Sequence, residues 1–279
     1  MAMTESGKSH FVPLLALRTL SALLFIVALL LLSSCSGSGK EGEVQVAAAA
    51  SMSDAVKELA AAYKKRHPQT TVRLTIASSG TLAAQIIKGA PVDVFISASR
   101  RQVRRIMDSG IETGNPRILC SNALVLAVPE GTPVEGRSGL AVLDLPHIGS
   151  IGMGDPEYVP AGHYAAAVLR GAGRSTNLGG TTVYGSSVRQ VLAWLTSGEV
   201  DAAFIYATDA ALVDDLMLAG RWDTVNGEKI RYPVLPLTEA DSNEEAERFA
   251  AFLSSSHAGE ILTRYGFTPV GSSEEGGAP

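Results

Sequence analysis

Four strand-to-helix junctions in the sequence carry groups that could bind an anion. Ser51 follows a run of alanines in "AAAASMSDAV", and Ser78 and Ser79 follow a strand-like segment in "TIASSGTL". The segments "YVPAGHY" and "GSSVRQ" place Ala161 and Val188 at helix starts, where only a backbone N–H could reach a ligand because these side chains cannot donate. Free N–H groups and the helix dipole favour an anion at a helix start without any lysine or arginine.

Each of these residues also has a purely structural interpretation. A serine at a helix start usually caps the helix, which is worth about 1 kcal/mol. Tyr206, the last residue of "AAFIY", could pack on the sheet or direct its hydroxyl at a ligand, and the sequence leaves both open. Arg189 opposes the dipole of its helix, so we expect it to pair with Asp155 or Glu157 instead of binding the ligand. His163 is expected to be a solvated helix residue rather than a catalytic base.

The elements that must position these groups alternate between strands and helices. Hydrophobic periodicity and breaker residues predict strands at 44–50, 71–77, 92–97, 118–129, 151–154, 181–185, 200–206 and 232–237. They predict helices that begin at 51, 81, 99, 161, 188 and 246 and end before 67 and at 88, 109, 170, 197 and 253. This alternation favours parallel strands with helices on both faces of a sheet.

Two segments, near 120–128 and 232–237, connect what look like two α/β units. We therefore expect a two-lobe α/β fold in which mixed sheets are flanked by helices and two crossing strands form a hinge beside the ligand cleft. Residues 43–122 and 236–270 form the first lobe, and residues 123–235 form the second. The prolines in 232–237 suggest an edge strand or a connector. Ser242 and Glu245 fit a capping box, and residues 271–279 fit a disordered tail.

The composition fits a globular domain and excludes several functions. The chain has 279 residues, 46% of them hydrophobic and 18% charged, which is enough for a substantial core. Its net charge of -5 argues against a nucleic-acid partner. None of the five histidines has metal-ligand spacing to another histidine or a cysteine. Cys120 lies in an apolar strand-like run and is expected to be buried and inert.

The N-terminal segment has the features of a processing signal. Lys8 and Arg18 precede or flank the apolar run "LSALLFIVALLLL", which is short for a membrane span. The following "LSSC" resembles the lipobox of bacterial lipoproteins, which implies a signal peptide over 1–34 and lipidation of Cys35. An ordinary signal peptide is the alternative. Residues 35–42 then form a flexible tether.

Several motifs together resemble the molybdate-binding proteins of bacterial ABC importers. They are "AAAASMSDAVKELAAAYKK", "ASSGTLAAQIIKGAPVDVFISA", "GDPEYVPAGHYA", "SSVRQVLAWL", "IYATDA" and "ILTRYGFTP", which occur in that order over nearly all of 43–270. The resemblance implies a type II periplasmic binding protein fold. The site residues it implies are Ser51, Ser79, Ala161, Val188 and Tyr206. Ala207 and Thr208 stand where relatives often have Gly and Ser, and "SSVRQ" departs somewhat ahead of Val188.

The resemblance also implies what the protein binds and where it works. The ligand is molybdate or tungstate, whose metal is held through its oxygens only, and no cofactor is expected. A site made only of donors favours a fully deprotonated anion, and sulfate would be excluded by size. The partners are an ABC permease and ATPase, and the protein is a monomer held on the periplasmic or cell-surface side by the lipid at Cys35.

Three other functions remain open at this point. The same fold could bind sulfate, thiosulfate or a small organic acid, although a carboxylate usually requires an arginine fork. An enzyme is disfavoured because the sequence contains no G-x-S-x-G, no P-loop and no histidine next to a candidate nucleophile. A structural or adhesive lipoprotein is the third possibility.

Overall fold

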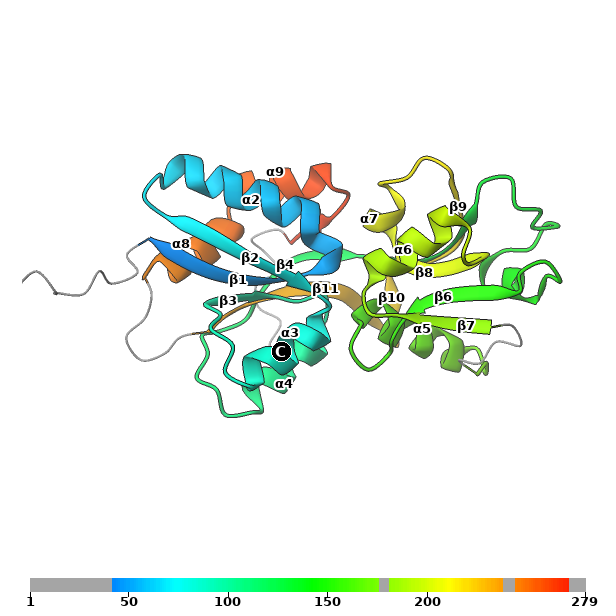
Figure 1. Ribbon diagram of the computed structural model, residues 1–279, viewed down its shortest axis with the longest axis horizontal. Coiled ribbons are helices and arrows are strands. Elements are labelled where there is room, and N and C mark those ends of the chain that lie inside the picture. The colour runs from blue at the N-terminus through cyan, green and yellow to red at the C-terminus, as the bar shows by residue number, and fades with distance from the viewer. Residues whose placement is uncertain (1–41, 176–180, 238–243, 271–279) are drawn as a thin grey trace, which may run out of the picture. The chain divides into compact units, whose positions relative to one another are not determined.

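The computed structural model describes residues 42–175, 181–237 and 244–270, and its strands form two sheets (Figure 1). Several predicted features lie outside the described residues: the signal peptide, the lipidation site Cys35, the tether up to residue 41, Ser242 and the tail. Within the described residues, no helix combines the length and the apolar character that a bilayer crossing requires.

The first sheet has seven strands in the described part of the chain. In spatial order six of them run β12, β4, β11, β3, β1 and β2, and β10 pairs with β11. Their bounds are β1 (Glu43–Ala49), β2 (Thr71–Ala77), β3 (Val94–Ile96), β4 (Arg117–Asn122), β10 (Thr224–Val225), β11 (Glu228–Pro236) and β12 (Thr268–Pro269). Strand β1 is parallel to β2 and β3, whereas β11 is antiparallel to β3 and β4. The sheet is therefore mixed, as predicted.

The second sheet has five strands in the order β7, β6, β8, β5 and β9. Their bounds are β5 (Leu124–Pro129), β6 (Ser150–Gly154), β7 (Thr181–Gly185), β8 (Ala202–Tyr206) and β9 (Leu216–Trp222). Strand β6 is parallel to β7 and β8, and β5 is antiparallel to β8 and β9. This sheet is also mixed, so each lobe is built on a sheet of the predicted kind.

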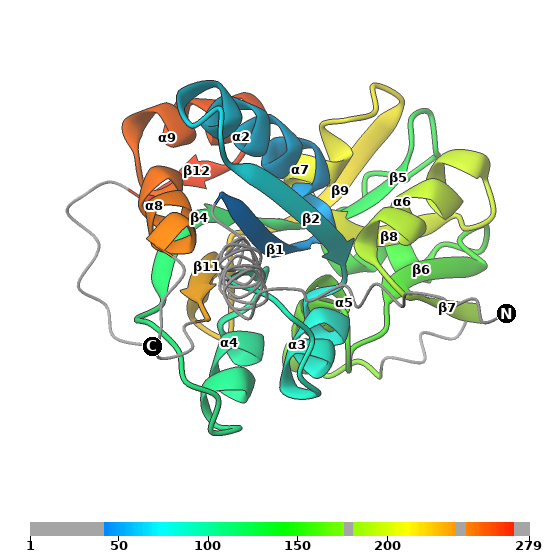
Figure 2. The ribbon, with the colours of Figure 1, turned by 60° about the vertical axis from the view of Figure 1, so that its left-hand side comes forward.

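Helices cover both faces of each sheet. Their bounds are η1 (Ala50–Met52), α2 (Ser53–Arg66), α3 (Ser79–Ile87), α4 (Arg100–Met107), η2 (Gly139–Asp144), α5 (Pro160–Gly171), α6 (Val188–Ser197), α7 (Ala207–Ala210), α8 (Glu244–Leu253) and α9 (Ser256–Arg264). Figure 2 shows α2, α8 and α9 grouped on one side of the first sheet and α3 and α4 on the other. Helices α5 and α6 lie on opposite sides of the second sheet (Figure 1).

Strand β1 explains why the first lobe has a core on each face of its sheet. Val46 and Ala48 belong to the large core that includes α2, whereas Ala47 packs with Leu82 and Val103 under α3 and α4. Because neighbouring strand residues point to opposite faces, a strand covered on both sides reads as a continuous apolar run. Strand β1, "EVQVAAA", is such a strand from Val44 onwards, and it ends where the candidate site begins.

The predicted strand 118–129 is wrong in one respect, because it is two strands that lie in different sheets. Strand β4 ends at Asn122 and β5 begins at Leu124. At the break, Asn122 Oδ1 accepts a hydrogen bond from Ala123 N at 2.8 Å, and Ala123 O accepts one from Ala207 N at 2.9 Å. These bonds replace the strand ladder locally, so the chain passes from one sheet to the other at Ala123.

The second crossing lies earlier in the chain than the sequence indicates. Strand β11 is hydrogen bonded between β4 and β3 in the first sheet, so residues 228–235, which we expected in the second lobe, belong to the first. The strand is also central and not an edge strand. The strand tolerates Pro233, which has no N–H to donate, because the pairing with β4 is irregular there: the register shifts between Tyr232 and Pro233.

Candidate ligand-binding site

The five residues predicted for the site line a single pocket. The first lobe contributes the turn after β1 and the start of α3, and the second contributes the starts of α5 and α6 and the end of β8. The pocket has an empty volume of ≈ 200 Å³, part of which is open to solvent. Its lining residues are Ala49, Ala50, Ser51, Ser78, Ser79, Ala98, Val159, Pro160, Ala161, Val188 and Tyr206. None of them carries a charged side chain.

Ser51 does not act as a helix cap. It lies in the short 3₁₀ turn η1 between β1 and α2, and neither η1 nor α2 has a side-chain cap. Its hydroxyl is buried, and Oγ lies 2.9 Å from the hydroxyl oxygen of Tyr232. The structural alternative for Ser51 is therefore wrong, and the hydroxyl remains available to the pocket.

The two serines of "SSG" have different roles. Ser78 is the N-cap of α3, where its Oγ accepts a hydrogen bond from Thr81 N at 3.3 Å. Ser79 is the first residue of the helix and is fully buried, and its Oγ accepts a hydrogen bond from Ala98 N at 3.0 Å. Because Ser79 Oγ already accepts, its proton remains free to be donated.

Ala161 and Val188 bring the starts of two helices of the second lobe to the pocket. They are the second residue of α5 and the first residue of α6, so their N–H groups have no acceptor within the helix. Helix α5 reaches this position because Gly162 packs against the end of β6. A Cβ on Gly162 would lie 1.8 Å from the carbonyl oxygen of Gly154, so only glycine fits there.

Tyr206 presents an unsatisfied hydroxyl to the pocket. The side chain is 1% exposed, and its hydroxyl has no hydrogen-bond partner among the described residues. Burial raises the pKa of Tyr206 well above its usual value, so the phenol stays neutral and can donate. A buried hydroxyl without a partner costs about 1–3 kcal/mol, and a bound acceptor would remove this cost. Of the two interpretations of Tyr206, the structure favours the one facing a ligand.

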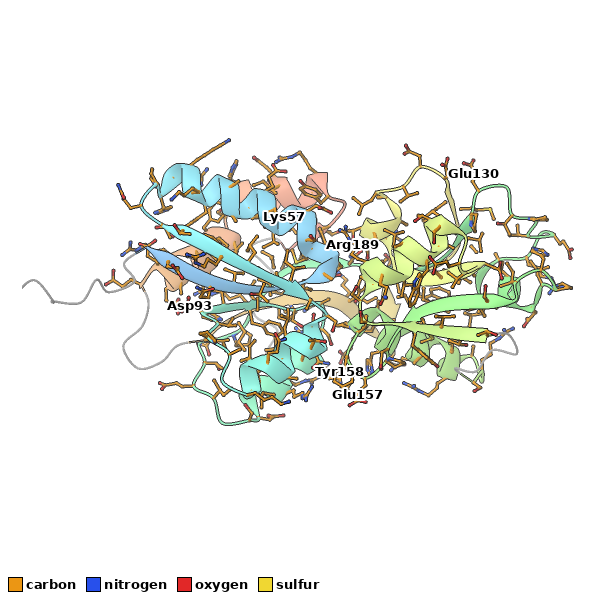
Figure 3. All side chains as sticks on the ribbon, in the orientation of Figure 1. Lys57, Asp93, Glu130, Glu157, Tyr158 and Arg189 are labelled. Atoms are coloured by element: carbon orange, nitrogen blue, oxygen red, sulfur yellow. The ribbon has the colours of Figure 1, made fainter. Side chains whose placement is uncertain are left out.

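Arg189 pairs with carboxylates, but not with the ones we expected. Its Nε lies 2.6 Å from Oδ1 of the buried Asp209, and its Nη1 lies 2.9 Å from Oδ2 of Asp54. Asp155, one of the predicted partners, instead accepts a hydrogen bond from Glu157 N. The prediction is wrong because the side chain runs from α6 towards α2 of the other lobe, away from the loop before α5 (Figure 3). The guanidinium therefore bridges the lobes outside the pocket lining.

A buried polar network behind the pocket could not be found from the sequence. Asn122 Nδ2 donates to the hydroxyl of Tyr232 at 3.2 Å and to Oγ1 of Thr208 at 2.9 Å. Asp209 lies beside this network, and burial raises its pKa to about 6 in spite of Arg189. Thr208 and Asp209 lie in the motif "IYATDA", but Asn122 and Tyr232 lie far from it in the chain and in none of the motifs, so the contact depends on the fold.

His163 and Cys120 were expected to be a solvated and a buried residue. His163 is half-buried instead of solvated, and its Nδ1 lies 3.3 Å from Nη1 of Arg101 on α4. Burial and the nearby Arg101 lower the pKa of His163. Cys120 is buried as expected, and burial raises the pKa of its thiol, which keeps it unreactive. The described residues contain no group of His, Cys, Asp and Glu that could hold a metal ion.

Two mixed α/β lobes joined by crossing strands, with a pocket built from helix starts of both, define a periplasmic-type solute-binding protein. The chain belongs to the bacterial extracellular solute-binding protein family, whose match covers residues 44–268.

Individual relatives fit this assignment. The chain is 34% identical over 252 residues to YvgL of Bacillus subtilis (strain 168), which is named as an ABC transporter substrate-binding lipoprotein, with coverage of 87% of this chain and 95% of that protein. It is 32% identical over 234 residues to the molybdate-binding protein ModA of Escherichia coli (strain K12), with coverage of 82% and 90%. The solved periplasmic molybdate-binding protein of Azotobacter vinelandii has a TM-score of 0.69 at 23% identity and covers 82% of this chain and 100% of its own, which supports the fold.

Proposed function

We propose that this protein binds molybdate, and also tungstate, as the extracytoplasmic solute-binding component of an ABC importer. The observation that carries the proposal is the pocket itself, which offers hydroxyls and helix starts from both lobes and no charged side chain. The relatedness to ModA of E. coli, a molybdate-binding protein, supports the same ligand.

Five residues would hold the anion through its oxygens. Ser51 and Ser79 donate hydroxyl and backbone protons from the first lobe, Ala161 and Val188 donate backbone N–H groups from the second, and Tyr206 donates its hydroxyl. Hydrogen bonds to an ion inside a dry pocket are each worth about 1.5–3 kcal/mol, so several donors can replace a salt bridge. No resident cofactor and no catalytic step are needed.

The chemistry of the pocket selects among oxyanions. A lining of donors favours an anion without protons, which disfavours phosphate near neutral pH because phosphate must donate one itself. Sulfate lacks protons too, so its exclusion depends on size: lobes closed on the larger molybdate leave the donors out of hydrogen-bond reach of the smaller ion. Molybdate and tungstate are nearly equal in size and are not separated by this argument.

The setting of the protein follows from its family and its N-terminus. The relationship to YvgL, which is named as a lipoprotein, supports cleavage before Cys35 and a lipid anchor there. The anchored monomer would deliver its closed, liganded form to a permease that works with an ATPase.

Calorimetry with molybdate, tungstate, sulfate and phosphate tests the proposal. We expect tight binding of the first two and no heat from the others. Ser51→Ala and Tyr206→Phe should each weaken binding by about 1–3 kcal/mol. Ser109→Ala is the matched control. Ser109 lies after the end of α4 and is exposed, and its hydroxyl donates to the carbonyl oxygen of Ile106. Binding of sulfate in preference to molybdate would refute the proposed ligand.

A further inference from the structure

The hydroxyl of Ser51 is the last member of a buried hydrogen-bonded chain. The chain begins at the backbone N–H of Ala123, passes through the side chains of Asn122 and Tyr232, and reaches Ser51 Oγ. Asn122 is 8% exposed and Tyr232 is fully buried, so the chain of bonds is shielded from bulk solvent. The order of donors and acceptors along it decides what Ser51 can offer to a ligand.

The orientation of Asn122 is determined by the crossing between the sheets. Ala123 N–H can only donate, so the atom 2.8 Å away must be the amide oxygen Oδ1. The amide nitrogen Nδ2 therefore points to the other side, where its two protons go to Thr208 Oγ1 and to the oxygen of Tyr232. Tyr232 consequently accepts a hydrogen bond from Asn122.

Among the described residues, the hydroxyl of Tyr232 is hydrogen bonded to the side chains of Asn122 and Ser51. With its oxygen accepting from Asn122, the phenol must donate its own proton, and Ser51 Oγ lies 2.9 Å away. Burial raises the pKa of Tyr232 well above its usual value, so the proton is present. In the reverse arrangement Ser51 would donate to Tyr232 and leave a fully buried phenol proton without an acceptor, which is costly. Ser51 Oγ therefore accepts from Tyr232.

We propose that Asn122 and Tyr232 are positioning residues that make Ser51 an obligate donor to the bound anion. Because Ser51 Oγ accepts the bond from Tyr232, its own proton cannot point at Tyr232 and is directed into the pocket, where a protonated ligand oxygen would meet a proton instead of a lone pair. The relay Ala123–Asn122–Tyr232–Ser51 thus disfavours protonated oxyanions such as hydrogen phosphate. This inference rests on the proposed function and assigns the origin of its selectivity to residues outside the pocket lining.

Two substitutions break and reverse the relay. Tyr232→Phe removes the bond into Ser51 Oγ, so the Ser51 hydroxyl is free to rotate and to turn a lone pair towards a protonated ligand. Asn122→Asp replaces the donor Nδ2 with an acceptor, so Tyr232 donates to the new carboxylate and Ser51 donates to Tyr232. The negative charge added by Asn122→Asp weakens the binding of every anion. The readout is therefore the ratio of the two affinities and not the affinity for one anion.

The measurement is calorimetry on the full chain with molybdate and with inorganic phosphate. In Tyr232→Phe we expect molybdate affinity to fall about tenfold and phosphate, which gives no heat with the wild type, to bind measurably. Measured against the detection limit for phosphate in the wild type, the ratio of affinities then shifts towards phosphate by more than about tenfold. The ratio shifts in the same direction in Asn122→Asp. Tyr63→Phe is the matched control, because it removes a fully buried tyrosine hydroxyl that donates to Glu245 at 3.3 Å, far along α2 from the pocket. The control leaves both affinities unchanged.

A double-mutant cycle separates the relay from a general loss of packing. In a Ser51→Ala background, Tyr232→Phe should have no further effect on the ratio, because the relay then ends on a methyl group. The relay proposal would be overturned by an equal loss of affinity for both anions in Tyr232→Phe, or by an unchanged ratio of affinities in both relay variants. Either result would leave the proposed function intact. Wild-type protein that binds neither molybdate nor tungstate would refute the proposed function itself.

Discussion

The backbone N–H of Gly80 donates a hydrogen bond of 2.9 Å to the carbonyl oxygen of Tyr158, and this bond joins the two lobes. Gly80 follows Ser79 at the start of α3, and Tyr158, labelled in Figure 3, precedes Val159 and α5. Because Ser79 and Val159 line the pocket, the contact lies at its edge. A Cβ on Gly80 would lie 2.4 Å from that oxygen, so the backbones can approach this closely only because position 80 is glycine.

Gly80→Ala should therefore hinder closure without unfolding either lobe. The added methyl group pushes Tyr158 away, so we expect affinity for molybdate to fall about tenfold or more. Calorimetry gives the affinity, and small-angle scattering with saturating ligand should show a more open protein. Gly171→Ala is the control, because a Cβ there meets nothing within 4 Å. Wild-type affinity in Gly80→Ala would show that this contact plays no part in closure.

Arg189 is expected to contribute to stability through the buried Asp209. Arg189→Met leaves a fully buried carboxylate without its cation, which should lower the free energy of unfolding by about 2–3 kcal/mol near neutral pH. The double variant Arg189→Met/Asp209→Asn should recover most of this loss, because no buried charge remains. Urea unfolding measures both. A double variant no more stable than the single one would contradict this account.

Tyr206→Phe should change stability and affinity in opposite directions. Removing a buried hydroxyl that has no partner should raise the free energy of unfolding of the unliganded protein by up to about 1 kcal/mol. The same change removes a donor to the anion and should weaken molybdate binding about tenfold. Thermal unfolding and calorimetry measure the two effects. Tyr63→Phe, which loses a satisfied hydroxyl, should instead lower stability and leave affinity unchanged.

Asp209 should make stability depend on pH in an unusual direction. Burial raises its pKa from 3.8 to about 6, so the folded protein binds this proton more tightly than the unfolded chain does. Protonation therefore stabilises the fold as pH falls through about 6, and the gain is complete below 3.8, at up to about 3 kcal/mol.

Asp209→Asn is the comparison that isolates this group, because every other titrating residue is shared. The free energy of unfolding of the wild type minus that of the variant should become more positive from about pH 7.5 to about pH 4.5. A difference that stays constant or falls over this range would show that Asp209 titrates at its usual pKa.

The sequence predicts well where a local signal is strong. The bounds 71–77, 181–185 and 188–197 agree with β2, β7 and α6, because each segment has a clear period and a serine, glycine or threonine at its ends. The site was predictable for a related reason: each of its five residues lies at a strand-to-helix turn or strand end, and the fold brings these turns to one place.

The remaining features depend on contacts between distant segments. Before its final proline, the apolar run 118–129 contains only Ser121 and Asn122 as turn-favouring residues. This signal is too weak to reveal that Asn122 and Leu124 pair in different sheets. Strand β9 was not predicted, because its residues are mostly half-buried and include Gly220. The direction of Arg189 towards Asp54 and Asp209 depends on how α6 faces α2, which short-range patterns do not contain.

The uncharged lining of the pocket has a consequence for how anion binding depends on salt concentration. At 0.1 M, dissolved salt largely screens the attraction between exposed charges that lie more than about 10 Å apart, but it hardly reaches dipoles once two lobes have closed around them. Capture that relies on enclosed amide and hydroxyl groups should therefore be nearly as strong in brine as in fresh water. A lysine-lined anion site would lose affinity over the same range, and the cell would have to compensate with more binding protein.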